Sequence, residues 1–469
     1  MTTSNTVENS LAAHFISAPW RSSGKSMVSM GLARAATRRS LGVQTFKKGP
    51  DYIDPLWLKA ASYNPCYNLD PYIQSNEELL GVYRQHANDV VLVEGTMGLH
   101  DGLAVDGSDS NAAIAKRLGL PVLLVIDCRG MHRTIASLVN GIMQFDPELN
   151  FSGLILNRIR SARHGSKIER AIEAYCDVSV MGVIPEQPQL RIEERELGLV
   201  PAPDHPAANT YLDCAADMLE ASCDLDALYA DNISYRNNSI ADKVVIESSS
   251  TLTIGVAKDE AFHFYYEDDL EELQSRGVRL VPFSPLRDPL PTELDGVLIG
   301  GGFPERHAAA LSQNQVCREG LANAIANGLP VRAECGGLMY LSQSIEIDNV
   351  VWTMVGAITG AVTMQASPQG RGYMKLTFDP SRPSAKTSSN TLPAHEFHHS
   401  KITFDTEPEY AYQVERGHGL DGMHDGVCVH NVVASYAHFR HTAATPWIDW
   451  FLDSILQAKQ GHHKKANHV

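Results

Sequence analysis

The segment around Cys335 has the pattern of a reactive cysteine at a sharp turn. A short strand-like run over 331–334 stops at this cysteine, and Gly336 and Gly337 follow before an amphipathic stretch begins. A strand that ends in a tight turn lifts the side chain at its tip away from the sheet, and a helix N-terminus behind it favours the thiolate. We interpret the segment as a nucleophile elbow with sulfur as the nucleophile. A buried structural cysteine is at least as common when this segment is taken alone.

A histidine about a hundred residues downstream could serve as the base for this cysteine. The strand-like run 434–438 ends in His438, and nucleophile and base are usually distant in sequence and adjacent in the fold. Three consecutive glycines, 300–302, follow another strand and expose backbone N–H groups. Placed near Cys335, such groups would form part of an oxyanion hole, whereas a tight turn is the purely structural alternative.

A second chemical pattern lies near the N-terminus. Residues 14–18 form a short strand, a polar loop follows, and Lys25 and Ser26 open a helix directly after Gly24. A phosphate-binding loop needs this order because backbone N–H groups and the helix N-terminus hold the phosphates, while the lysine reaches them. Gly24 is the loop's single glycine, with Ala18 and Pro19 where an upstream glycine is usual. The alternative is a polar loop that merely caps a helix.

Acidic residues stand where a parallel sheet would collect them. Glu94 ends an apolar strand over 89–93, and the loop 47–54 holds two lysines and the carboxylates Asp51 and Asp54. Ligands of open α/β sheets bind at the carboxyl ends of the strands, so Glu94 would face the phosphate loop and hold magnesium, directly or through water. Taken singly, such acids often cap the next helix.

The order of elements predicts an α/β protein with two domains. Strand and helix patterns alternate up to residue 228, which favours a mainly parallel sheet flanked by helices. Residues 229–250 are polar and read as a linker, and alternation resumes over 251–460. The histidine- and lysine-containing tail 461–469 is expected to be disordered.

Composition excludes several classes of protein. A net charge of −16 argues against broad nucleic-acid binding, and no apolar run approaches the roughly 20 residues that span a bilayer. The eight cysteines form no CxxC pair, so neither a disulfide framework nor a zinc site is expected. With a polar N-terminus that lacks a signal pattern, these features predict a cytoplasmic protein.

Taken together, the motifs resemble the cobyrinic acid a,c-diamide synthase family, glutamine-dependent amidotransferases that amidate tetrapyrrole carboxylates. The resemblance runs almost end to end. It is carried by the stretches 24–26, 46–54, 93–102, 260–266, 300–305, 333–341, 395–398 and 434–438. It implies an N-terminal dethiobiotin-synthetase-like P-loop domain and a C-terminal class I glutamine amidotransferase domain of flavodoxin-like fold. By the same resemblance we expect a homodimer.

The resemblance also implies roles for individual residues. They are Cys335 as glutaminase nucleophile and His438 as its base; Gly24, Lys25 and Ser26 at ATP; Ser26, Asp51 and Glu94 at Mg²⁺; Asp54 and Asp106 at the substrate acyl phosphate; and Gly301, Gly302 and Gly336 in the oxyanion hole. One departure is Arg440, which stands two residues after His438, where many other class I amidotransferases carry the glutamate that orients the histidine.

The implied reaction is amidation of the a and c acetate groups of a corrin precursor, with ATP supplying an acyl phosphate and glutamine supplying ammonia. Sirohaem and nickel sirohydrochlorin present similar acetates and are alternative substrates. Basic and aromatic side chains, with His263 and Tyr265 among them, are expected to receive the tetrapyrrole. Two rivals from other classes are a partitioning-type regulatory ATPase, which leaves Cys335 without a purpose, and a non-catalytic tetrapyrrole carrier, which releases no glutamate.

Overall fold

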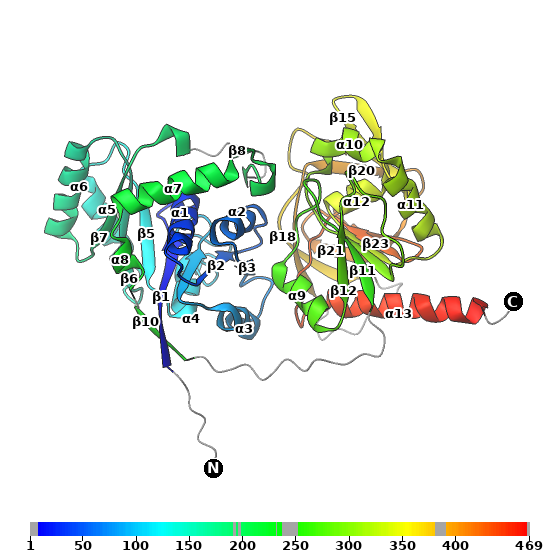
Figure 1. The fold of residues 1–469 in the computed structure, drawn as a ribbon, viewed down its shortest axis with the longest axis horizontal. Coiled ribbons are helices and arrows are strands. Elements are labelled where there is room, and N and C mark those ends of the chain that lie inside the picture. Colours follow the sequence, from blue (N-terminus) through cyan, green and yellow to red (C-terminus); the bar gives the residue numbers. More distant parts are fainter. Residues whose placement is uncertain are drawn as a thin grey trace, which may run out of the picture. The chain divides into compact units, whose positions relative to one another are not determined.

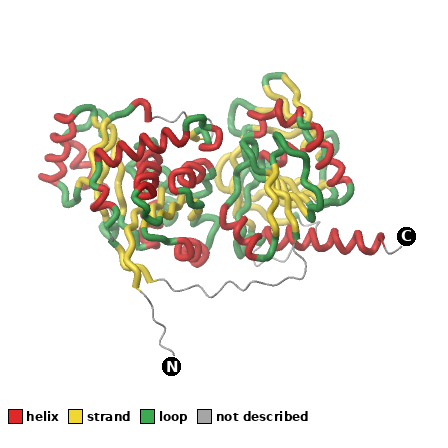
Figure 2. Tube along the Cα trace, viewed as in Figure 1, coloured by secondary structure: helices red, strands yellow, loops and turns green. Residues whose placement is uncertain are grey.

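The chain folds into two compact units, Met1–Asp242 and Lys243–Val469. The computed structural model describes residues 8–190, 194–195, 198–230, 232–236, 252–379 and 391–466. Each unit alternates helices with strands (Figures 1 and 2). Each also encloses its own hydrophobic core.

The first unit is built on a sheet in the order β3-β2-β4-β1-β5-β6-β7, in which neighbouring strands run parallel. The strands are β1 (Glu8–Ser17), β2 (Val43–Lys48), β3 (Cys66–Leu69), β4 (Val90–Glu94), β5 (Val122–Asp127), β6 (Phe151–Ile159) and β7 (Val180–Pro185). The strands β4 and β5 are near-continuous apolar runs, which suit a sheet covered on both faces. The expected parallel sheet is therefore confirmed.

Helices cover both faces of this sheet. They are α1 (Lys25–Arg38), α2 (Ile53–Ser62), α3 (Asn76–His86), α4 (Asn111–Leu118), α5 (Thr134–Phe145), α6 (Ala162–Tyr175), α7 (Ala208–Ser222) and α8 (Leu225–Leu228). Buried residues of α3 to α6 join one core cluster with alternate residues of the central strands, while α1 packs against α2 and α7. A short hairpin, β8 (Glu194–Arg195) and β9 (Gly198–Leu199), precedes α7.

The predicted linker over 229–250 is wrong in its first part. Strand β10 (Ile233–Arg236) lies within it and pairs antiparallel with β1, where Ile233 faces Leu11. Asn232 adds hydrogen bonds to both backbone groups of Ala13. This part of the segment therefore belongs to the first unit, and 237–250 lie outside the described residues.

The second unit has a mixed sheet in the order β12-β11-β13-β14-β23-β22-β21-β18-β19. Its parallel half contains β11 (Thr253–Ala257), β12 (Arg279–Phe283), β13 (Gly296–Ile299), β14 (Val331–Glu334) and β23 (Val432–Ser435). Its antiparallel half contains β18 (Gly370–Phe378), β19 (Leu392–His398), β21 (Glu409–Arg416) and β22 (His424–Val429). A smaller sheet contains β15 (Ser342–Ile347), β16 (Val350–Thr353), β17 (Ile358–Met364) and β20 (Ser400–Phe404).

Helices flank the parallel half of this sheet on both faces. One core cluster takes buried residues from α10 (Ala308–Gln313), α11 (Gln315–Ala326) and α12 (Gly336–Leu341), and another takes them from α9 (Glu267–Ser275) and α13 (Trp447–Ala466). Helix α13 corrects the expectation of a disordered tail over 461–469, because it continues through Ala466. Residues 467–469 lie outside the described part of the chain. Among the described residues, no helix is long and apolar enough to cross a membrane.

Candidate active site

Cys335 lies at a strained turn between β14 and α12. Its backbone has φ 48° and ψ −102°, a left-handed conformation that non-glycine residues rarely adopt and that often marks a functional position. Strand β14 pairs in parallel with β23, so Cys335 and the segment leading to His438 leave the sheet at the same edge. Cys335 N donates to Ser435 O at 2.7 Å, which ties the turn to β23. The predicted sharp turn at Cys335 and its proximity to the second segment are confirmed, whereas the role of Cys335 as nucleophile stays a prediction.

The predicted glycines gather at this edge. A Cβ added to Gly301 would lie 2.5 Å from His438 Cε1, so the imidazole occupies the space that a side chain would need. A Cβ on Gly336 would lie 3.1 Å from Gly302 N, which places these two backbone segments in contact. The structure thus brings Gly301, Gly302 and Gly336 beside Cys335 and His438, an arrangement that suits backbone donors around a developing oxyanion.

The pKa shifts of Cys335 and His438 both favour the neutral forms of these side chains. Burial raises the pKa of the Cys335 thiol, and the nearby Glu305 and Glu334 carboxylates add to that effect. Burial, followed by the charge of His398, lowers the pKa of His438 to about 3. The raised pKa of Cys335 opposes the thiolate that the helix N-terminus was expected to favour. A neutral imidazole can still accept the thiol proton when the sulfur attacks.

Two aromatic residues expected around the tetrapyrrole have structural partners inside the second unit. The Tyr265 hydroxyl donates to Ala257 O and accepts a hydrogen bond from Gly300 N at 2.8 Å. His263 is buried, with Nδ1 3.3 Å from Asp259 O. The Tyr265 hydroxyl therefore holds the glycine segment in place, and a role of Tyr265 and His263 at the tetrapyrrole stays a prediction.

In the first unit, the loop before α1 has the geometry of a phosphate loop. Gly24 caps α1 with φ 101°, and an added Cβ would lie 2.1 Å from Asn157 Nδ2. Lys25 Nζ donates to Met97 O at 2.6 Å. Burial and the neighbouring Lys47 lower the pKa of Lys25 to about 8. Glycine is thus required at position 24, and the lysine that follows has less tendency to carry its charge than an exposed lysine.

The predicted carboxylates converge on Lys47. Its ammonium lies 2.9 Å from Glu94 Oε1 and 3.8 Å from Asp51 Oδ2, and it forms a still closer ion pair with Asp54. The pKa of Lys47 is raised well above its usual value because these carboxylates outweigh burial. Burial raises the pKa of Asp51 to about 7, whereas Lys47 keeps the pKa of Asp54 below its usual value despite burial.

The described residues contain no group of three or more His, Cys, Asp or Glu side chains placed to hold a metal ion by themselves, but this cluster offers carboxylate and hydroxyl oxygens. Ser26 Oγ donates to Glu94 Oε1 at 2.7 Å and lies 3.5 Å from Asp54 Oδ2. Glu94 Oε2 is buried with no hydrogen-bond partner among the described residues. Carboxylate and hydroxyl oxygens are ligands that Mg²⁺ prefers, and a buried oxygen without a partner is an available one. Asp51 differs, since its Oδ1 accepts hydrogen bonds from Ile53 N and Asp54 N and caps α2.

The hydrogen bond that the structure shows for the Asp106 carboxylate lies within its own loop. Asp106 is exposed on the loop before α4, and its carboxylate accepts a hydrogen bond from Ser108 N at 3.0 Å. The same loop contacts lower its pKa. Its predicted role at the acyl phosphate thus receives no support from a contact with the Lys47 cluster.

Comparison with known proteins covers both units. Residues 253–445 match the model of the CobB/CobQ-like glutamine amidotransferase domain, and residues 13–194 match an AAA domain. The "Cobyrinate a,c-diamide synthase" of Magnetococcus marinus is 42% identical over 92% of this chain and 95% of its own. Proteins of the same name from Methanosarcina acetivorans and Listeria monocytogenes are each 36% identical, over 94% and 90% of this chain and 94% and 95% of their own.

The chain belongs to the cobyrinate a,c-diamide synthase family. The resemblance drawn from the motifs is confirmed, and so are the P-loop and glutamine amidotransferase folds of the two units.

The motifs did not single out Lys47 or Glu334 in this family member. Lys47 lies on β2 directly opposite Glu94 of β4, and the parallel register of these strands is what joins them. For Lys47, the signal available in the sequence was a loop that holds two lysines and two carboxylates. Glu334 precedes Cys335 in the chain, and nothing in its position alone indicated that it contacts the histidine.

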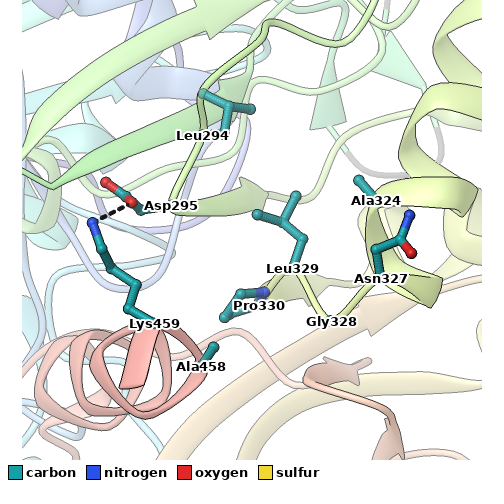
Figure 3. Close-up of a pocket in the computed structure, with 9 residues that line it drawn as sticks. All are labelled: Leu294, Asp295, Ala324, Asn327, Gly328, Leu329, Pro330, Ala458 and Lys459. Carbon is teal, nitrogen blue, oxygen red and sulfur yellow. Dashed lines mark hydrogen bonds and ion pairs between the residues drawn. The ribbon is translucent and has the colours of Figure 1, made fainter. Parts of the chain in front are cut away.

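Two grooves of the second unit lie at elements other than the cysteine turn. One, of about 420 Å³, is lined by residues just before β13 and β14 and by α13, where Lys459 pairs with Asp295 at 2.6 Å (Figure 3). The other, of about 280 Å³, lies between α13 and β21 to β23. Because Cys335 follows the carboxyl end of β14, the first groove lies at the opposite edge of the sheet.

Proposed function

We propose that the protein amidates the a and c acetate carboxylates of cobyrinic acid, using ATP and glutamine, in cobalamin biosynthesis. The observation that carries the proposal is the 42% identity to a cobyrinate a,c-diamide synthase over nearly the full length of both chains. The retention of a cysteine turn in one unit and a phosphate loop in the other supports it, since both half-reactions need their own site.

The second unit would release ammonia from glutamine. Cys335 Sγ attacks the side-chain amide carbon as its proton passes to His438, and the oxygen becomes negative against the N–H groups near Gly302 and Gly336. His438 then protonates the departing nitrogen, which leaves as ammonia. Water cleaves the γ-glutamyl thioester, so glutamate is released and the thiol is restored.

The first unit would activate the carboxylate. The substrate carboxylate attacks the γ-phosphorus of ATP, ADP leaves, and ammonia displaces phosphate from the acyl phosphate to give the amide. Gly24, Lys25 and Ser26 would hold the phosphates, and Lys47 would offset negative charge at the transferring group. Magnesium, held by Ser26, Glu94 and Asp54, would neutralise phosphate charge when bound. Asp54 here replaces the predicted ligand Asp51, because Asp51 Oδ1 already accepts two backbone hydrogen bonds. A homodimer remains a prediction by family likeness.

Product masses test the substrate. The enzyme is incubated with glutamine and magnesium-ATP against cobyrinic acid, hydrogenobyrinic acid, sirohaem and nickel sirohydrochlorin, separately. Each conversion of a carboxyl to an amide lowers the mass by about one unit, and two successive losses on cobyrinic acid are expected. Two losses on sirohaem alone would identify a different tetrapyrrole. If none of the four changes while glutamine is hydrolysed, the tetrapyrrole assignment is wrong.

A further inference from the structure

The carboxylate of a buried glutamate lies beside the proposed histidine base, and this glutamate precedes the cysteine in the chain. Glu334 Oε2 lies 3.7 Å from His438 Nδ1, and both side chains are almost completely buried. Glu334 is the residue immediately before Cys335, at the end of β14. The distance suits an ion pair and exceeds a hydrogen bond, as catalytic contacts often do before substrate binds.

Arg440, two places after His438, cannot orient the histidine as a glutamate at that position would. Arg440 is a cation, is fully buried, pairs with Asp268 at 2.5 Å, and has its guanidinium carbon 5.0 Å from the centre of the Tyr266 ring. Its neighbour His441 is held through its backbone N–H by Asp269. The chain after His438 is thus anchored to α9 through the Arg440 side chain and the His441 backbone.

Glu334 is held in one orientation by partners on its other oxygen. Its Oε1 accepts hydrogen bonds from Arg332 Nη2 at 3.1 Å and from Phe439 N at 3.4 Å. Arg332 is itself fixed, with its guanidinium carbon about 5 Å from the Phe439 and Trp447 rings. Oε2 therefore remains directed at His438. Burial raises the pKa of the Glu334 carboxyl, and the ion pair with Arg332 opposes that rise.

We propose that Glu334 is the positioning residue of His438, taking the part that a glutamate after the histidine has in other class I amidotransferases. This inference rests on the proposed glutaminase role of Cys335 and His438. With Nδ1–H directed at Glu334, Nε2 is the nitrogen left to accept the proton from Cys335 Sγ. The resulting imidazolium gains a charge-assisted contact with Oε2, and the same proton later goes to ammonia.

The test compares Glu334→Gln, Glu334→Asp and the control Glu396→Gln in the full-length enzyme. Glu396 is a similarly buried glutamate whose carboxylate accepts hydrogen bonds from His418 N and Gly419 N and lies 3.5 Å from His398 Nε2, one histidine removed from His438. For Glu334→Gln we expect kcat for glutamine hydrolysis to fall about ten- to hundredfold, the cost of losing a charged contact. KM for glutamine should stay within twofold, because Glu334 acts through His438. Glu334→Asp should retain more activity than Glu334→Gln, and Glu396→Gln should stay within threefold of wild type.

Amide synthesis from free ammonia separates this inference from a folding defect and from the proposed function. It should be unchanged in every variant. If Glu334→Gln fails to fold, Glu334→Asp carries the test with an expected three- to tenfold loss in kcat at constant KM. Wild-type kcat in the folded Glu334 variants, or equal losses in Glu334→Gln and Glu396→Gln, overturns the inference. Glutamine hydrolysis that survives in Cys335→Ala would overturn the proposed glutaminase site instead.

Discussion

His438 differs from an ordinary histidine base in the pH at which its imidazole takes up a proton. Burial and His398 bring its pKa to about 3, which favours the neutral imidazole between pH 5 and pH 8. A free-enzyme group governs the pH dependence of kcat/KM, and a base must be unprotonated to act. A base with the usual histidine pKa near 6.5 would lose activity as the pH falls through that value. His438 should not.

We therefore predict that kcat/KM for glutamine stays within about twofold between pH 8 and pH 5. The thiol adds no step in this range, because burial raises the pKa of Cys335. Glutamate release is measured at low glutamine. Amide synthesis from a fixed concentration of unprotonated ammonia is the control that accounts for titration in the first unit. A tenfold loss centred near pH 6.5 would contradict the prediction.

At the scale of elements, the start of α1 depends on one glycine. Gly24 combines a φ of 101° with the amide of Asn157 in the space of a Cβ, and Asn157 Nδ2 in turn donates to Ser23 O at 2.9 Å. An alanine here meets both strain and collision. It must displace the side chain that holds the phosphate loop.

We predict that Gly24→Ala lowers ATP affinity at least tenfold and destabilises the protein by about 1–3 kcal/mol. The matched control is Gly119→Ala. Gly119 also has positive φ, 67°, at the end of α4, but nothing lies within 4 Å of an added Cβ. It should cost only about 1 kcal/mol and leave ATP affinity unchanged. Calorimetric titration with magnesium-ATP and thermal unfolding measure both effects, and equal ATP affinity in the two variants would refute the steric account.

Elements with local signals were predictable, and those defined by distant pairing were not. The turn at Cys335 and the start of α1 are marked by glycines beside short apolar runs, so the motifs placed them. Strand β10 lies in a polar stretch and exists through its pairing with β1, more than 200 residues away. The last turns of α13 are polar, and they continue a helix whose apolar residues pack on the sheet earlier in its length.

The site shows the same division between what is local and what depends on the register of strands. Cys335, His438 and Gly24 could be predicted from their residue types and from their neighbours in the sequence. The contact of Lys47 with Glu94 follows from the register of β2 and β4. The contact of Glu334 with His438 likewise requires that β14 and β23 be adjacent. One sequence without its sheet order contains neither fact.

At the scale of the whole molecule, the two proposed half-reactions reside in units that each have their own sheet and core. Ammonia is the one chemical product of the second unit that the first requires. Supplying ammonia from solution should therefore bypass the cysteine entirely. It cannot bypass the phosphate loop, because the acyl phosphate forms there.

We predict that Cys335→Ala lowers glutamine-dependent amidation of cobyrinic acid at least about a thousandfold while leaving ammonia-dependent amidation within about twofold of wild type. Lys25→Ala is the reciprocal variant. It should abolish amidation with either nitrogen donor, because the positive charge that Lys25 places at the phosphates is lost. The variant should still bind glutamine at Cys335. Amide product is measured by mass for each variant with each donor. Loss of both activities in a folded Cys335→Ala protein would mean that the cysteine also serves the ATP-dependent step, and the division of labour between the two units would be wrong.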